Sequence, residues 1–277
     1  MQNYKEEILI NSKSGQEFIS ISEIWRYRDL FYIFTWRDLK VRYKQTILGI
    51  LWVVFQPLMT TLIFTVFFGN LAKIPSGKLP YSLFVLCGLV FWTFFSTALT
   101  HASDSMVANE SIIKKVYFPK IILPFSSILT SFVDFLINFI ILLVFAMVVG
   151  YYPSIWALII FPVAIFITGL TSVGLGLLLA SINVKYRDVR YILPFFIQIL
   201  LFLTPVIYPL SIVSDRNKMI MALNPLTSVV EFARVVFYKE LIIGPELILI
   251  SVSSSLVIFF IGIWYFRKTQ MFFADIV

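Results

Sequence analysis

The sequence predicts an all-α integral membrane protein that crosses the bilayer six times, and both its composition and its apolar stretches support this. Of its 277 residues, 60% are apolar and only 13% are charged, whereas a water-soluble domain carries about 25% charged residues. A membrane-spanning helix needs about 20 consecutive apolar residues. Six stretches are of about this length, and they cover residues 47–69, 80–101, 121–149, 154–182, 191–208 and 247–266.

The chain divides into a cytoplasmic N-terminal segment, residues 1–45, and a transmembrane domain, residues 46–277. No long apolar stretch precedes the first span, so this span is expected to be an anchor that is not cleaved. If the N-terminus is cytoplasmic, the inner segments hold 16 of the 22 Lys and Arg residues. Lys and Arg concentrate on the cytoplasmic side of membrane proteins, so both termini are expected inside. The net charge of +7 reflects this topology and does not indicate nucleic-acid binding.

Residues 20–45 are expected to form a helix before the first span. Ser20 followed by Glu23 is a capping-box pattern at its start. One helix face collects apolar and aromatic side chains, namely Ile21, Trp25, Tyr32, Trp36, Leu39 and Tyr43. Trp and Tyr suit the headgroup level of a membrane, so the pattern indicates an amphipathic helix in the inner interface. This helix is either a simple anchor or an anchor that also touches a cytoplasmic partner.

A second short helix, residues 109–116, is expected between the second and third spans. Asn109 is its expected cap, and Glu110 lies in its first turn. Lys114 and Lys115 lie in its last turn, which is the charge order that the helix dipole favours. This helix is either an ordinary solvated loop element or a rigid contact for another protein.

The connection between the fifth and sixth spans, residues 209–246, is long and mixed in composition. Asn224-Pro225 is followed by an apolar stretch that is too short to cross the bilayer. A re-entrant or interfacial helical hairpin on the outer face fits this pattern. Glu231 and Arg234 lie three residues apart and are expected to pair on one helix face.

Polar residues inside the spans each need a partner or a function. Asp134 would cost about 2.5–3.5 kcal/mol in the middle of the third span, and Asn138 lies one turn further on, where it can hydrogen-bond this carboxyl. An ion-coupling site usually gathers several such groups, so a packing role for Asp134 is favoured over an ion site. Small residues in the fourth span permit close helix packing, and they are Thr168, Ser172, Gly176 and Ala180.

The sequence predicts no catalytic, cofactor-binding or metal site. Cys87 and His101 are its only cysteine and histidine, and metal or redox sites need several such residues. The nucleotide-binding loops and hydrolase motifs do not occur in the sequence. We therefore expect that this chain does not hydrolyse ATP, and that the energy for any uphill transport comes from another protein.

Aromatic residues make up 17% of the chain, including 29 Phe. Many are expected to form the belts at the two membrane surfaces. Others are candidates for lining a substrate path, because aromatic rings present broad apolar faces to sugars and lipid chains. These candidates are Phe55, Phe195, Phe196, Phe202 and Tyr208.

Four segments along the chain resemble one family of membrane proteins. They are FTWRDLKVRYKQTILGILW at residues 34–52, which Gln56-Pro57 follows, YFPKIILP at 117–124, NVKYRD at 183–188 and TPVIYP at 204–209. In this order, over nearly the whole chain, they resemble the ABC-2 type polysaccharide-export permeases. The nearest branch is the permease of O-antigen (lipopolysaccharide) exporters, and teichoic-acid and capsule exporters are close to it.

The resemblance implies a permease subunit of the bacterial inner membrane that forms a homodimer and binds two copies of a cytoplasmic ATPase, which carries ATP and Mg. The two permease copies enclose a channel near the first and fifth spans, and they export a lipid-linked glycan. The implied ATPase-coupling residues are Arg37, Asp38, Arg42, Asn109, Glu110, Lys114 and Lys115. The implied outer gate covers residues 209–240, with Pro209, Pro225, Glu231 and Arg234.

Three other functions remain open from the residues themselves. The first is an ABC-2 permease for a small molecule or drug, which shares the fold but matches the N-terminal motif less strongly. The second is an ion-coupled secondary transporter, which predicts clustered carboxylates and inverted repeats within the membrane, and the sequence shows neither. The third is a membrane scaffold without transport.

Overall fold

The computed structural model describes residues 25–44, 49–238, 244–270 and 273, and all regular elements in these ranges are helical. The expected capping box of Ser20 and Glu23 lies outside the described residues. The elements are α2 (Arg28–Lys44), α3 (Gly49–Phe64), the π-helical η2 (Thr65–Leu71), α4 (Tyr81–Ala108), α5 (Glu110–Ile113), α6 (Ile122–Val148), α7 (Ala157–Lys185), α8 (Val189–Leu203), the 3-10 helix η3 (Leu210–Ile212), α9 (Asp215–Ala222), α10 (Pro225–Tyr238) and α11 (Pro245–Thr269).

Five helical stretches are long and apolar enough to cross a membrane, and they confirm five of the six predicted spans. They are Leu51–Leu71, Tyr81–Ala108, Ile122–Val148, Ala157–Lys185 and Glu246–Thr269. A sixth is counted only if α9 and α10, which meet at an angle of 106°, are taken as one broken span.

The predicted fifth span, residues 191–208, is a shorter helix than expected. It corresponds to α8, whose 15 residues reach about 22 Å at 1.5 Å per residue, against a hydrocarbon core of about 30 Å. The helix ends because Thr204 is extended (φ −90°, ψ 135°) and precedes Pro205, whose ring disfavours the α conformation of the residue before it.

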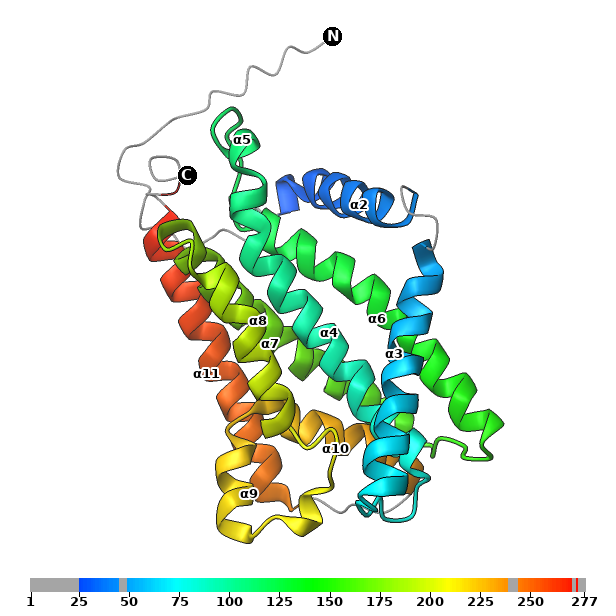
Figure 1. Cartoon of the computed structure of the whole chain (residues 1–277). Helices are drawn as coiled ribbons and strands as arrows, with labels where there is room; N and C mark the ends of the chain where they lie inside the picture. Colours follow the sequence, from blue (N-terminus) through cyan, green and yellow to red (C-terminus); the bar gives the residue numbers. More distant parts are fainter. Residues whose placement is uncertain (1–24, 45–48, 239–243, 271–272, 274–277) are drawn as a thin grey trace.

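The helix α4 is the centre of the bundle. It packs mainly against α6 and α7, and α11 packs against the other side of α7. Figure 1 shows α3 and α8 on opposite sides of α4. The two ends of the bundle differ, because α2, α5 and the end of α11 gather at the top of this view, whereas α9 and α10 lie at the bottom.

The helix α2 packs on the bundle through a different face from the predicted stripe. Phe31 contacts Phe125 with ring centres 6.3 Å apart, and Phe34 contacts Phe118 at 5.8 Å. Tyr32 and Trp36 of the predicted stripe stack on each other and are more than half exposed. Both sides of α2 are therefore apolar. Tyr32 and Trp36 of the stripe face away from the protein, whereas Tyr43, at the end of the stripe, contacts Asp134 in the bundle.

Small residues bring α7 close to two neighbours, as the sequence predicts. Thr168, Ser172, Gly176 and Ala180 are all buried, and a Cβ added to Gly176 would lie 2.8 Å from Ala102 of α4. On the side of α11, a Cβ added to Gly262 would lie 2.0 Å from the carbonyl oxygen of Gly174. The two helix backbones are therefore in direct contact at this point.

Replacement of Gly262 by Ala should destabilise the protein, because the added methyl group forces α7 and α11 apart. The separation also weakens the hydrogen bond between Thr171 and Ser255, which is 3.0 Å long. Overpacking of this kind costs about 1–3 kcal/mol, which a thermal unfolding curve in detergent measures. Gly169→Ala on α7 is the matched control, since no atom lies within 4 Å of its added Cβ. An equal loss in the two variants would contradict this account of the packing.

Candidate functional site

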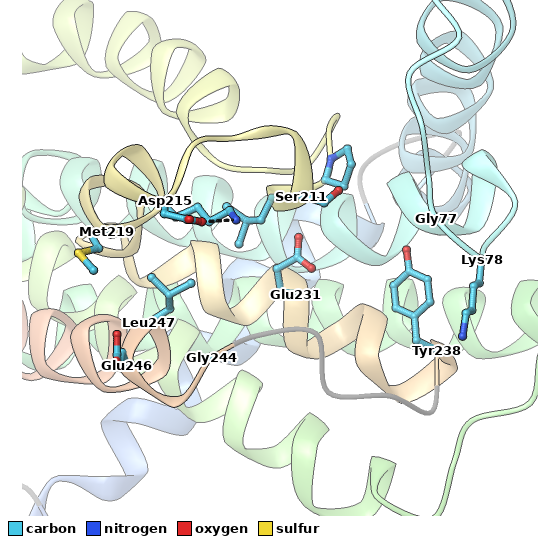
Figure 2. Close-up of a pocket in the computed structure, with 13 residues that line it drawn as sticks. Gly77, Lys78, Ser211, Asp215, Met219, Glu231, Tyr238, Gly244, Glu246 and Leu247 are labelled. Carbon is cyan, nitrogen blue, oxygen red and sulfur yellow. Dashed lines mark hydrogen bonds and ion pairs between the residues drawn. The ribbon is translucent and has the colours of Figure 1, made fainter.

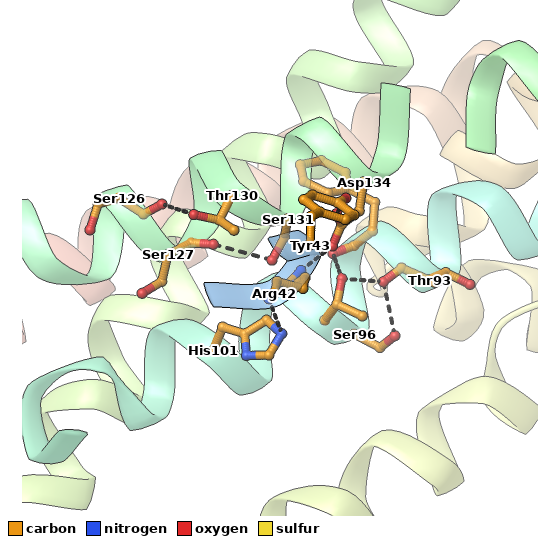
Figure 3. A network of polar contacts seen from close by, with 12 residues as sticks. Arg42, Tyr43, Thr93, Ser96, His101, Ser126, Ser127, Thr130, Ser131 and Asp134 are labelled. Atoms are coloured by element: carbon orange, nitrogen blue, oxygen red, sulfur yellow. Dashed lines mark hydrogen bonds and ion pairs between the residues drawn. The ribbon is translucent and has the colours of Figure 1, made fainter. Parts of the chain in front are cut away.

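A charged network joins three helices near the end of the bundle that holds α5. Arg42 and Tyr43, at the end of α2, both donate hydrogen bonds to the carboxylate of Asp134 on α6. The second terminal nitrogen of Arg42 lies 2.8 Å from Nε2 of His101 on α4. Figure 3 shows these four side chains converging from the three helices.

The network accounts for the carboxylate of Asp134 within a span. A charge at this depth is costly, and pairing with a cation offsets part of the cost. The side chain of Asp134 is only 13% exposed and that of Arg42 is 28% exposed. Burial, together with the hydrogen bond to Asp134, raises the pKa of Tyr43, so its hydroxyl keeps its proton and remains a donor. The expected hydrogen bond from Asn138 to Asp134 is wrong, because Arg42 and Tyr43 occupy this carboxylate.

Four of the seven predicted coupling residues line one cavity beside this network. The cavity has a volume of about 600 Å³ and lies between α2, α4 and α6. Arg37 and Asp38 face it and form a pair with 2.8 Å between their nitrogen and oxygen atoms. Arg42 and Asn109 also line it. Arg42 therefore points into the bundle, although its predicted role as an ATPase-coupling residue required it at an external surface.

The predicted helix at residues 109–116 is shorter in the structure. Asn109 is at its N-cap position, as predicted, but its side chain makes no capping hydrogen bond. α5 contains only Glu110–Ile113. The side-chain amide of Asn109 donates to the carbonyl oxygen of Ser105 at 2.8 Å, so it closes the end of α4 and makes no cap for α5. Lys114 pairs with Glu110 at 2.7 Å, and this hydrogen bond holds the pKa of the Glu110 carboxyl below its ordinary value.

Asp104 is a residue that sequence reasoning missed. It lies beyond the predicted end of the second span, on the last turns of α4, and accepts a hydrogen bond of 3.1 Å from Asn183. Arg190 approaches the same carboxylate at 3.3 Å. Asn183 begins the NVKYRD segment, so this segment ties the turn between α7 and α8 to α4. The NVKYRD segment stands out in the sequence, but no short-range sequence pattern links it to Asp104.

At the other end of the bundle, the predicted pair of Glu231 and Arg234 is confirmed, with 2.8 Å between Nη1 and Oε1. The guanidinium of Arg234 is fully buried and lies 3.4 Å from the ring centre of Phe84. It also donates to the carbonyl oxygens of Phe84 at 3.2 Å and Val206 at 2.8 Å. Arg234 thus fastens α10 both to α4 and to the chain that follows α8.

A cavity of about 590 Å³ opens beside α10 (Figure 2). Pro209 and Glu231 line it, together with Tyr238, whose hydroxyl donates to the carbonyl oxygen of Ser76 at 2.7 Å. Pro225 is the first residue of α10, where a proline's missing N–H costs no helical hydrogen bond. All four predicted gate residues therefore lie in or directly before the bent segment that forms this end of the molecule.

The predicted channel aromatics lie on two separate surfaces. Phe55 is exposed on α3, whereas Phe195, Phe196 and Phe202 are exposed on α8. Tyr208 follows α8 and donates to the carbonyl oxygen of Phe202 at 2.9 Å. Because α4 separates α3 from α8 (Figure 1), one copy of the chain does not bring these two groups together. Within the described ranges, no group of three His, Cys, Asp or Glu side chains is placed to hold a metal ion.

Five helices that are long and apolar enough to cross a bilayer define a multi-pass membrane protein. The profile of the ABC-2 type transporter family matches residues 29–238, and the chain belongs to this family.

Three relatives illustrate the similarity. The O-antigen export system permease protein RfbA of Myxococcus xanthus is 29% identical over 92% of this chain and 98% of its own length. A protein of the same name from Klebsiella pneumoniae is 28% identical over 90% of this chain and 95% of its own. The polysialic acid transport protein KpsM of Escherichia coli is 22% identical over 84% of this chain and 91% of its own.

Proposed function

We propose that this chain is the permease subunit of an ATP-driven exporter, which moves a lipid-linked, O-antigen-like polysaccharide across the bacterial inner membrane. The observation that carries this proposal is its similarity, over nearly its full length, to proteins named for O-antigen export. Transport of the glycan starts on the cytoplasmic side of the membrane, and both termini of the chain lie on this side. The positions of 16 of the 22 Lys and Arg residues support this orientation.

A separate ATPase supplies the energy, because the sequence contains no nucleotide-binding loop. Two copies of this ATPase dock at the end of the bundle that carries α2 and α5. Lys114 and Lys115 beside α5 are exposed and offer it a charged contact. A movement of α2 caused by the ATPase is transmitted to the spans through Arg42, which contacts both α4 and α6.

The helix α2 lies in the inner membrane interface as an amphipathic anchor. Its outward stripe supports this, because Tyr32 and Trp36 are exposed and such side chains favour the headgroup level. The opposite face holds α2 on the bundle through Phe31 and Phe34. This division gives one helix two partners, the lipid surface and α6.

Two copies of the chain form the channel as a homodimer. The separation of the aromatic surfaces supports this, because α3 of one copy and α8 of the other can supply Phe55 and the α8 rings to one path. The bent segment of α9 and α10 is a re-entrant outer gate. Its two helices together are apolar enough for the membrane but turn by 106°.

The proposed docking is tested with a charge exchange on α5. Lys114→Glu should lower co-purification of the ATPase encoded beside this gene by about 10-fold, since it replaces the exposed cation of the proposed contact with an anion. The double variant Glu110→Lys/Lys114→Glu restores the pair within the helix but reverses its charges, so it should bind equally poorly.

The matched control is Lys218→Glu, which changes a partly exposed charge of α9 at the opposite end of the bundle and should leave co-purification unchanged. Rescue of binding by the double variant would show that only the shape of α5 matters. Failure of any ATPase to co-purify with the unaltered chain would refute the proposed function.

A further inference from the structure

A second cavity lies deeper in the bundle, at the level of the spans. It has a volume of about 400 Å³ and lies between α3, α4 and α6. Asn138, which lines it, is ten residues from the end of α6 at Val148, or about 15 Å at 1.5 Å per residue. This depth is close to the middle of a hydrocarbon core about 30 Å thick.

The amide oxygen of Asn138 lacks a hydrogen-bond partner among the residues that the structure describes, although this residue is only 3% exposed. A buried polar atom without a partner costs several kcal/mol in an apolar environment. Asn138 also lines a cavity large enough for a ligand, since binding sites hold roughly 300–1,000 Å³. Its amide is therefore a buried polar group that borders this space.

Other polar groups in this cavity are suited to a hydroxyl-rich ligand. The side chains of Gln56, Thr97 and Ser131 line it. The hydroxyls of Thr97 and Ser131 already donate to backbone carbonyl oxygens, so they offer lone pairs to further donors. An acyl chain offers no donor to these lone pairs or to the amide of Gln56, so the lining suits a hydroxyl-rich ligand better than a lipid tail.

Aromatic rings complete the lining, since Trp52, Phe94 and Phe135 also border the cavity. Amides and hydroxyls beside aromatic faces suit a sugar ring, which carries hydroxyls on its edge and C–H groups on its faces. We propose that this cavity binds one sugar residue of the transported glycan, an inference that rests on the proposed function and adds a recognition site to it.

On the side of α5, this cavity adjoins the cavity of about 600 Å³ described above. Arg42 and His101 line both this cavity and the 600 Å³ cavity between α2, α4 and α6. Thr93, Ser131 and Asp134 line the deeper cavity beside Arg42, and Figure 3 labels all four residues. A sugar that enters from the α5 end meets the Arg42 network before it reaches Asn138.

Protection of an introduced cysteine tests the site. The variant Cys87→Ala/Thr97→Cys places one thiol in the cavity, because Cys87 is the only native cysteine. The complex with its ATPase, in lipid nanodiscs, is treated with a small water-soluble thiosulfonate. Short oligosaccharides hydrolysed from the strain's own surface polysaccharide should slow labelling about 10-fold at ten times their dissociation constant. Polyethylene glycol of matched size should leave the labelling rate unchanged.

Two further variants in this background assign the protection to the cavity. Asn138→Leu should abolish the protection, and so should Gln56→Leu. The side chain of Gln56 is exposed, so its replacement leaves the fold intact. The matched control is Ser172→Ala, because Ser172 also has a buried hydroxyl without a partner among the described residues but lies on α7, outside this lining. Protection should persist in that control.

Three results would overturn the inference: no labelling of Thr97→Cys, labelling that the oligosaccharides do not slow, or protection that survives both leucine variants. The second of these would mean that the cavity holds water only. Each leaves the proposed function intact if the unaltered chain still exports the glycan in cells. A failure of the proposed function itself would be recognised separately: cells without this chain would carry as much surface glycan as cells with it.

Discussion

Replacement of Arg42 by Met should strongly destabilise the protein and its export activity, because it leaves the carboxylate of Asp134 within the bundle without its cation. Removing one partner of a buried ion pair costs about 3–5 kcal/mol, and the 28% exposure of Arg42 reduces this figure. Thermal unfolding of the purified complex measures the loss. Surface glycan in cells should fall in parallel, since α2 loses its ion pair with Asp134 of α6 and its contact with His101 of α4.

The double variant Arg42→Met/Asp134→Leu is the decisive companion to this experiment. It removes both charges together. Its loss of unfolding free energy should therefore be about 1–3 kcal/mol smaller than the sum of the losses in the two single variants. Additive losses would contradict a direct pair. Asp134→Asn keeps an acceptor for Tyr43 and should export substantially at all pH values. Loss of export in a variant that still folds would instead indicate an ion-coupling site, because an amide can neither bind nor release a proton.

Replacement of Arg234 by Met should produce the largest stability loss of any single change at the α9–α10 end. The guanidinium is 0% exposed, pairs with Glu231 and holds two backbone carbonyl oxygens. Its removal leaves all three acceptors without this donor, and the buried pair alone is worth about 3–5 kcal/mol when broken. A fall in Tm of the detergent-purified protein measures this effect.

A matched control uses the second pair with the same spacing. Lys218 and Asp215 are also three residues apart, with 2.8 Å between nitrogen and oxygen, but the Asp215 side chain is 93% exposed. Lys218→Met should leave Tm unchanged, because exposed pairs contribute little. A similar fall in both variants would mean that burial of Arg234 does not determine the stability of this end.

Hydropathy predicted the long spans well but their ends less well. The third span was expected at residues 121–149 and is Ile122–Val148, because Lys120 comes just before its start and Gly150, with φ 86°, follows its end. The second was expected to end at residue 101, yet α4 continues to Ala108. Its last turns are polar, and contacts such as that of Asp104 with Asn183 keep them helical. Hydropathy records exposure to lipid and does not register such contacts.

Local pairs were predictable, whereas distant ones were not. Glu231 and Arg234 lie on one helix face, so their spacing alone predicted the contact. Arg42 and Asp134 are 92 residues apart, and no periodic pattern links them. Asn138 was the nearer partner for Asp134, but tertiary packing brought a stronger donor to the carboxylate. The same limit applies to Asn109, whose side chain closes α4 by a contact that its capping pattern does not reveal.

The central claim is that this chain exports a polysaccharide with the energy of a separate ATPase. Deletion of its gene, followed by staining of intact cells for their surface glycan, tests this claim most directly. We expect surface glycan to disappear while lipid-linked glycan accumulates on the inner face, and we expect the same result when the partner's nucleotide site is inactivated. Unchanged surface glycan in the deletion strain would contradict the account.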